Sequence, residues 1–130
     1  NRTWTRVGAG GSEFAVGEKA LFGLSMDRGA VFEWTVSTGW VRIGAGAGNI
    51  YAGGYGLVAT GVLGTDAWLY LDGTGWQPIG DSGQTFALTT DALFRLDWSG
   101  EVEKYDYSSE LWSPITEPGW ISVELVPCPL

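Results

Sequence analysis

The sequence contains no histidine and only one cysteine, Cys128. Without an imidazole there is no Ser-His-Asp or Cys-His nucleophile, no histidine metal site and no histidine general base. Cys128 lies in the proline-flanked stretch VPCPL, where no neighbouring charge would activate its thiol. We therefore expect a protein that is not an enzyme, with no catalytic residues, no metal ligands and no cofactor.

Basic residues are also scarce. Seven Lys and Arg stand against 15 Asp and Glu, and the net charge is −8 at pH 7. Nucleic acids and anionic lipid surfaces are bound by positively charged surfaces, so neither is an expected partner. No apolar run approaches the roughly 20 residues of a membrane-spanning helix, so no membrane span is expected.

Glycine and tryptophan are abundant instead. The 130 residues include 21 glycines and 8 tryptophans, and 45% of the chain is apolar. This length suits one domain, and the composition is typical of an all-β protein with many tight turns. An acidic, lysine-poor β-protein also suggests a secreted, extracellular location, and Asn1-Arg2-Thr3 matches a glycosylation acceptor pattern.

A hexapeptide is repeated along the chain. GWVRIG at Gly39–Gly44 returns as GWQPIG at Gly75–Gly80, with looser copies TWTRVG at Thr3–Gly8 and LWSPIT at Leu111–Thr116. The four tryptophans of this repeat are spaced by 36 residues: Trp4, Trp40, Trp76 and Trp112. Three positions later the aliphatic residues also align: Val7, Ile43, Ile79 and Ile115. A period kept over this length indicates stacked or radially arranged supersecondary units.

Each unit reads as four short strands. In the second unit these are Trp40–Ile43, Ile50–Ala52, Gly56–Thr60 and Ala67–Leu71, separated by glycine-rich turns. Four strands in about 40 residues are typical of a β-propeller blade. A β-trefoil and a type II β-prism are the alternatives with threefold repeats. The Gln-x-Trp signal of the first and the Gln-x-Asp-x-Asn-x-Val-x-Tyr strand of the second are both missing.

The expected fold is therefore an all-β propeller of three full blades plus partial strands, either a half ring or a fragment. Over the single domain 1–130 the blade units lie near 4–39, 40–75 and 76–111, with closing strands over 112–125 and a tail at 126–130. The tryptophan strand is the fourth of its blade, and Trp120–Leu125 would start another. Three blades do not close a ring, since propellers have at least four. We expect a homodimer, or a place in a longer chain.

The pattern resembles tectonin repeats and the tachylectin-like propeller lectins over residues 4–115. It is carried by FAVGEKALFGLSMDRGAVFEW at Phe14–Trp34, by FALTTDALFRLDWSGEVEKYDY at Phe86–Tyr107, and by IYAGG, YGLVAT and WLYLDGTGW in the second unit. Those families repeat a Trp-x-x-Ile/Val-Gly strand, two apolar strands and an aromatic strand that ends in Asp-Gly. The resemblance implies carbohydrate recognition, with a glycan or glycoprotein bound at one site per blade or blade gap.

Candidate ligand residues are aromatic and acidic side chains outside the repeated tryptophan column, which we interpret as core between blades. They are Trp98, Asp97, Trp68, Trp34, Asp72 and Asp27. Aromatic rings stack on the C–H face of sugars, and turn carboxylates bind hydroxyl groups. A structural explanation competes at each position, because Asp-Gly and Asp-Arg turns form without any ligand.

Other functions stay open at this point. A protein-interaction or targeting domain, as part of a larger secreted protein, would use the same propeller faces. A glycoside hydrolase would need a carboxylate pair such as Asp97 with Glu101, or Glu101 with Glu103. Calcium at Asp97–Glu103 would lack the alternating acidic ladder of a loop site. Thr65–Trp68 differs from Glu101–Lys104 in the next unit, so we expect the binding sites to be unequal.

Overall fold

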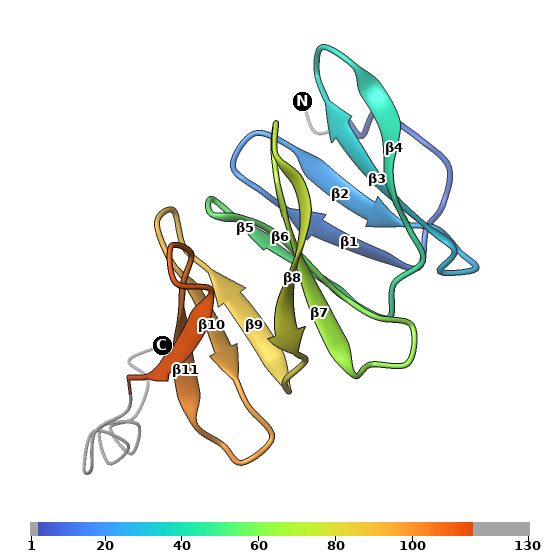
Figure 1. Cartoon of the computed structure of the whole chain (residues 1–130). Coiled ribbons are helices and arrows are strands. Elements are labelled where there is room, and N and C mark those ends of the chain that lie inside the picture. Colours follow the sequence, from blue (N-terminus) through green and yellow to red (C-terminus); the bar gives the residue numbers. More distant parts are fainter. Residues whose placement is uncertain (1–2, 116–130) are drawn as a thin grey trace, which may run out of the picture.

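The computed structural model describes residues 3–115, which form twelve β-strands. These strands build three four-stranded antiparallel sheets, each from four consecutive strands (Figure 1). The first sheet contains β1 (Glu13–Val16), β2 (Leu21–Leu24), β3 (Ala30–Thr35) and β4 (Gly39–Ala45). The second contains β5 (Ile50–Gly53), β6 (Gly56–Thr60), β7 (Asp66–Leu71) and β8 (Gly75–Asp81). The third contains β9 (Thr85–Leu88), β10 (Leu93–Leu96), β11 (Val102–Asp106) and β12 (Leu111–Pro114).

The three sheets stack face to face in chain order. Their first strands, β1, β5 and β9, contact one another in succession. The first and third sheets lie at opposite ends of the stack (Figure 1). This arrangement is all-β and propeller-like, as the repeat predicts. It differs from a β-trefoil, whose hairpins close one barrel, because here every four strands form a sheet of their own. Within residues 3–115 no helix is long and apolar enough to cross a membrane.

The strand boundaries of the second unit agree with the sequence prediction to within two residues. Each tryptophan strand is the fourth strand of its sheet, so a sheet combines most of one Trp-to-Trp unit with the start of the next. The opening segment Thr3–Gly8, expected to be such a strand, pairs with no strand in the structure. The expected closing strand Trp120–Leu125 and Cys128 lie outside the described residues.

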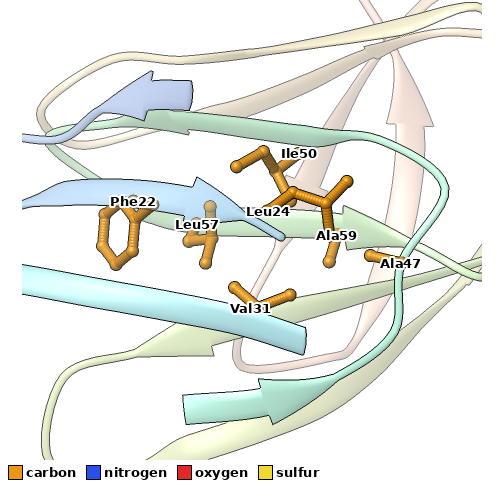
Figure 2. Close-up of a cluster of buried hydrophobic side chains, with 7 residues drawn as sticks. All are labelled: Phe22, Leu24, Val31, Ala47, Ile50, Leu57 and Ala59. Carbon is orange, nitrogen blue, oxygen red and sulfur yellow. The ribbon is translucent and has the colours of Figure 1, made fainter. Parts of the chain in front are cut away.

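Each sheet has a front face, toward the preceding sheet, and a back face, toward the following one. Residues directly opposite each other in an antiparallel pair share a face, so the pairing register assigns every side chain to one of them. The back face of the first sheet presents Phe22, Leu24 and Val31, and the front face of the second presents Ile50 and Leu57. These residues form one buried cluster with Ala47 and Ala59 (Figure 2). A second cluster joins the second and third sheets and has seven buried members: Val58, Ala67, Leu69, Ile79, Phe86, Leu93 and Tyr105.

The repeated tryptophans connect neighbouring sheets. The indole nitrogen of Trp76 donates a hydrogen bond of 2.7 Å to the carbonyl oxygen of Ile43, and that of Trp112 donates one of 2.6 Å to Ile79. Both rings pack against the buried clusters. The prediction that the column belongs to the core between blades is confirmed at Trp76 and Trp112. It is wrong at Trp4, which is fully exposed. A Cβ at Gly44 would lie 3.0 Å from the Trp76 ring, which explains why glycine follows the aliphatic residue in the repeat.

Within residues 3–115 no sheet covers the front of the first sheet or the back of the third. On the front of the first sheet Phe14 is 51% exposed and Val16 72% exposed, whereas Ile50 and Phe86, at the position of Phe14 in the other sheets, are buried. Part of this face is covered by the segment Thr3–Gly8, because Trp40 donates a hydrogen bond of 3.0 Å to the carbonyl oxygen of Val7. Val7 therefore takes the place that Ile43 has beside Trp76.

Candidate ligand-binding grooves

A groove of about 660 Å³ runs between the first and second sheets. Its aromatic wall is formed by Trp68 and Trp76 on the front of the second sheet, with Ala59 beside them. The Trp68 ring is partly exposed, and its indole nitrogen donates a hydrogen bond of 2.9 Å to Oδ2 of Asp66. Asp66 and Trp68 are two apart on β7, so both side chains project from one face of the strand. The groove thus combines an aromatic plane with an adjacent carboxylate.

Backbone forms the other walls of this groove. One wall is the glycine-rich stretch 44–46, and the other is the β6–β7 turn over 61–65. Small residues bring the main chain close, as a Cβ at Gly46 would lie 2.7 Å from the carbonyl oxygen of Arg28. Main-chain amides and carbonyls on such walls are groups that can fix the orientation of a polar ligand.

The equivalent space between the second and third sheets is filled by the paired side chains of Arg95 and Glu103. The register places Arg95 where the second sheet has Ala59, and Glu103 where it has Trp68. Arg95 Nη2 lies 2.7 Å from Oε1 of Glu103, and its Nη1 donates a hydrogen bond of 2.7 Å to the carbonyl oxygen of Asp81. Its guanidinium carbon lies 4.2 Å from the centre of the Trp112 ring. The aromatic plane that stays open at Trp76 is therefore covered at Trp112.

A third equivalent groove, of about 230 Å³, lies on the open front of the first sheet. Gly23 and Phe32 stand here at the positions of Ala59 and Trp68, and Trp40 stands at that of Trp76. The stretch Ala9–Gly11 forms the facing wall. The three grooves thus share one position in the repeat but differ in chemistry: an apolar one, one with an aromatic ring and a carboxylate, and one closed by an ion pair.

A separate polar pocket of about 280 Å³ lies between the first and second sheets and includes Glu33, Tyr70 and Asp72. Burial, followed by the negative charge of Asp72, raises the pKa of Glu33 above its ordinary 4.5. Burial, followed by the charge of Glu33, raises the pKa of the Tyr70 hydroxyl. Glu18 and Lys19 complete its charged lining. Of the six ligand residues predicted from the sequence, Asp72 lines this pocket and the other five do not.

Two other predicted carboxylates are engaged within their own turns. Oδ1 of Asp27 accepts hydrogen bonds from the Ser25 hydroxyl and the Gly29 amide, at 2.7 and 2.9 Å. These bonds lower the pKa of Asp27. Oδ1 of Asp97 accepts from the Ser99 hydroxyl at 2.7 Å, and this bond with the backbone amides of the turn lowers the pKa of Asp97.

The remaining predicted aromatics are also dispersed. Trp34 faces Trp40 across β3 and β4 on the open front of the first sheet, at the position that Tyr70 occupies in the second. Trp98 is exposed at the tip of the β10–β11 turn, beside Asp97. Apart from that adjacent pair, the structure does not bring the six predicted residues together at one site.

Sequence reasoning missed three residues that shape the grooves. Asp66 was identifiable, because an acidic residue two positions before an exposed strand tryptophan shares its face. Arg95 aligns with Ala59 in the 36-residue period, but its partner Glu103 is one residue out of step with Trp68, so the sequence does not show that the two side chains meet. Glu33 had the appearance of an ordinary strand residue in the sequence.

Acidic ligand atoms of Asp97, Glu101 and Glu103 lie within 4.8 Å of one another in the third sheet. Glu103 already pairs with Arg95, and Asp97 already accepts three hydrogen bonds from its turn. Both residues therefore have structural roles in the ion pair and the turn.

Comparison with known proteins adds no assignment. No protein-family model matches the sequence, and no curated protein matches it significantly.

Proposed function

We propose that this chain is a non-enzymatic, carbohydrate-binding module of the propeller type, and that the groove at Trp68 is its principal ligand site. The observation that carries the proposal is the partly exposed Trp68 ring, held by the Asp66 carboxylate above an open groove. A pyranose stacks its C–H face on such a ring, and the second carboxylate oxygen, Oδ1, accepts bonds from its hydroxyls. The resemblance to tectonin and tachylectin-like repeats supports the same class of ligand, and the acidic, lysine-poor composition supports an extracellular location.

The inequality of the three grooves makes the proposal more specific. Among the three grooves of residues 3–115, the groove between the first and second sheets is the one that pairs a tryptophan face with a nearby carboxylate oxygen that accepts no side-chain hydrogen bond. The third-sheet equivalent is occupied by Arg95, and the first-sheet equivalent presents Phe32 with no acidic neighbour among its lining residues. The described part of the chain should therefore bind one glycan strongly, and any further sites weakly.

The test is a glycan array followed by titration of the selected glycan. Replacing Trp68 by Ala should raise the dissociation constant about tenfold, as expected when about 1–1.5 kcal/mol of aromatic contact is lost. Asp66→Asn keeps the acceptor for the indole but removes the charge, and should weaken binding less. Unchanged thermal melting of both variants would show that the fold is intact.

Trp98→Ala is the matched comparison, because Trp98 is also a tryptophan and is more exposed than Trp68, but lies in the β10–β11 turn instead of on strand β7. If Trp98 and Asp97 form the site, as the sequence suggests, this variant loses affinity and Trp68→Ala does not. Equal affinity of wild type and Trp68→Ala would refute the groove as the principal site.

A second candidate function, protein interaction, is favoured by a row of exposed apolar side chains. Met26, Val62 and Trp98 are each 36 residues apart, and they are 72%, 67% and 69% exposed. All three lie in the turn between the second and third strands of their sheet, along one edge of the stack (Figure 1). Exposed apolar groups mark a protein-binding surface where they gather into one patch. A blank glycan array would favour this function.

A further inference from the structure

Each of the two open faces at the ends of the stack shares apolar residues with one of the faces that pack inside it. The open back of the third sheet and the packed back of the first sheet agree in residue type at five register-equivalent positions. The pairs are Ala15 with Ala87, Phe22 with Phe94, Leu24 with Leu96, Val31 with Val102, and Ile43 with Ile115. In the first sheet these residues belong to, or pack against, the buried cluster of Figure 2. In the third sheet these residues are half-buried or exposed, and no described sheet packs against them.

The open front of the first sheet agrees with the packed front of the third at three apolar positions, although Gly23 and Phe32 stand where the third sheet has Arg95 and Glu103. Its Phe14, Leu21 and Trp40 correspond to Phe86, Leu93 and Trp112, which pack against the second sheet. The back of the first sheet packs against the front of the second, and the front of the third packs against the back of the second, so each open face resembles a face that already packs within this chain. The front of the second sheet also has Leu57 and Trp76 where the first has Leu21 and Trp40. The two open faces lie at opposite ends of the stack and cannot meet in one molecule (Figure 1).

We propose that the front of the first sheet binds the back of the third sheet of a second copy, head to tail. Two copies joined by two such contacts would bring six sheets together, which is within the four to eight blades of closed propellers. Each contact is heterologous, because the front face of one copy meets the back face of the other. Two such contacts, related by a twofold axis, close the two copies into a ring. This proposal is independent of the ligand.

The N-terminal segment occupies part of the binding face. The carbonyl oxygen of Val7 accepts the Trp40 indole hydrogen bond at 3.0 Å, and Val7 belongs to the same sequence column as Ile115. In the dimer the carbonyl oxygen of Ile115 of the second copy would be the acceptor for Trp40, as Ile43 is for Trp76. The segment Thr3–Gly8 must then leave, so it competes with association. Lys104, at the register position of Glu33, would come to face Trp34 across the contact, as Glu33 faces Tyr70.

Sedimentation equilibrium of the full chain over a range of concentrations tests the proposal. Wild type is expected to show the mass of two copies. Val16→Asp places a charge on the front face and Ala87→Asp places one on the back face, and both sites are exposed, so both variants should fold. Each alone should raise the dissociation constant by about 30-fold or more, as loss of an interface hot spot does. Val36→Asp, at the exposed β3–β4 turn, is the matched control and should leave it unchanged.

Mixing the two interface variants gives the sharpest result. The Val16→Asp copy keeps an intact back face and the Ala87→Asp copy keeps an intact front face, so one good contact forms and heterodimers should appear. A chain that starts at Ala9 should associate more tightly than the full chain. A wild type that stays monomeric at every concentration would overturn the proposal and leave the two faces to sheets of a longer polypeptide. Failure of the mixture to associate would also overturn it, because a head-to-tail contact requires this rescue.

Discussion

The indole nitrogen of Trp76 in β8 donates a hydrogen bond of 2.7 Å to the carbonyl oxygen of Ile43 in β4 of the preceding sheet. Trp40 with Val7 and Trp112 with Ile79 make the same bond at the same separation of 33 residues. The repeated hexapeptide therefore contains both halves of this connection. The tryptophan binds the preceding sheet, and the aliphatic residue three positions later offers its carbonyl to the next tryptophan.

Replacing Trp76 by Ala should destabilise the fold severely, by about 3–5 kcal/mol, because it removes a large ring from the contact between two sheets. Trp76→Phe keeps much of the ring but leaves the Ile43 carbonyl without its donor, and should cost about 1–3 kcal/mol. Urea denaturation of both variants measures these losses. Trp4→Ala is the control, since Trp4 is fully exposed. Near-native stability of Trp76→Ala, with binding lost instead, would assign the column to the ligand site.

Trp40→Ala should cost less than Trp76→Ala, although the two positions are equivalent in the sequence. Trp40 lies on the open front face and contacts the segment Thr3–Gly8 rather than a complete sheet. A side chain on an open face makes fewer apolar contacts than one between packed sheets, so its removal costs less stability. Both substitutions should be made in the Val16→Asp variant, which is expected to be monomeric. Urea denaturation then compares the two losses of stability without a contribution from association. Equal losses for the two variants would contradict this order.

Substitutions that remove the Arg95–Glu103 ion pair should open the groove between the second and third sheets. Arg95→Ala with Glu103→Trp rebuilds the arrangement of Ala59 and Trp68, and Glu101 already stands at the register position of Asp66. We expect the double variant to bind two glycans per chain instead of one, measured by calorimetric titration. Arg95→Ala alone should only reduce stability, by about 1–3 kcal/mol, because the Glu103 carboxylate loses its partner. A stoichiometry unchanged in a folded double variant would show that the aromatic plane and carboxylate are insufficient.

Glu33 should make the fold less stable as the pH rises. Burial and the charge of Asp72 raise its pKa above 4.5 in the folded state, so folding favours the protonated carboxyl. This contribution is fully present below pH 4.5 and is lost as the pH rises through the folded-state pKa. Glu33→Gln should therefore be more stable than wild type at pH 7, and the difference should shrink as the pH falls toward 4. Glu13→Gln offers a comparison at a carboxylate outside this pocket. A difference independent of pH would refute titration of Glu33 as its cause.

Much of the fold follows from local sequence. The 36-residue spacing of Trp40, Trp76 and Trp112 predicts repeated units, and glycine-rich turns between short apolar runs predict four strands in each. These features are local, because turn geometry and strand alternation depend on neighbouring residues. The tryptophan column could be interpreted as core for the same reason, since a large ring at a fixed position in every unit indicates a repeated contact.

The groove chemistry was decided by tertiary structure alone. Ala59 and Arg95 occupy equivalent positions, but only the stacking of sheets shows that one leaves the neighbouring tryptophan open and the other covers it. Trp34 resembles a free ligand residue in the sequence, yet it stands at a packing position whose neighbouring sheet is missing from the described chain. Burial and side-chain contacts between sheets join residues about 30 positions apart. They are therefore fixed by how whole sheets pack, and local sequence patterns do not show them. The sequence by itself therefore determined the repeat, the strands and the tryptophan contacts. The packed sheets decided which groove stays open and which faces are left to bind.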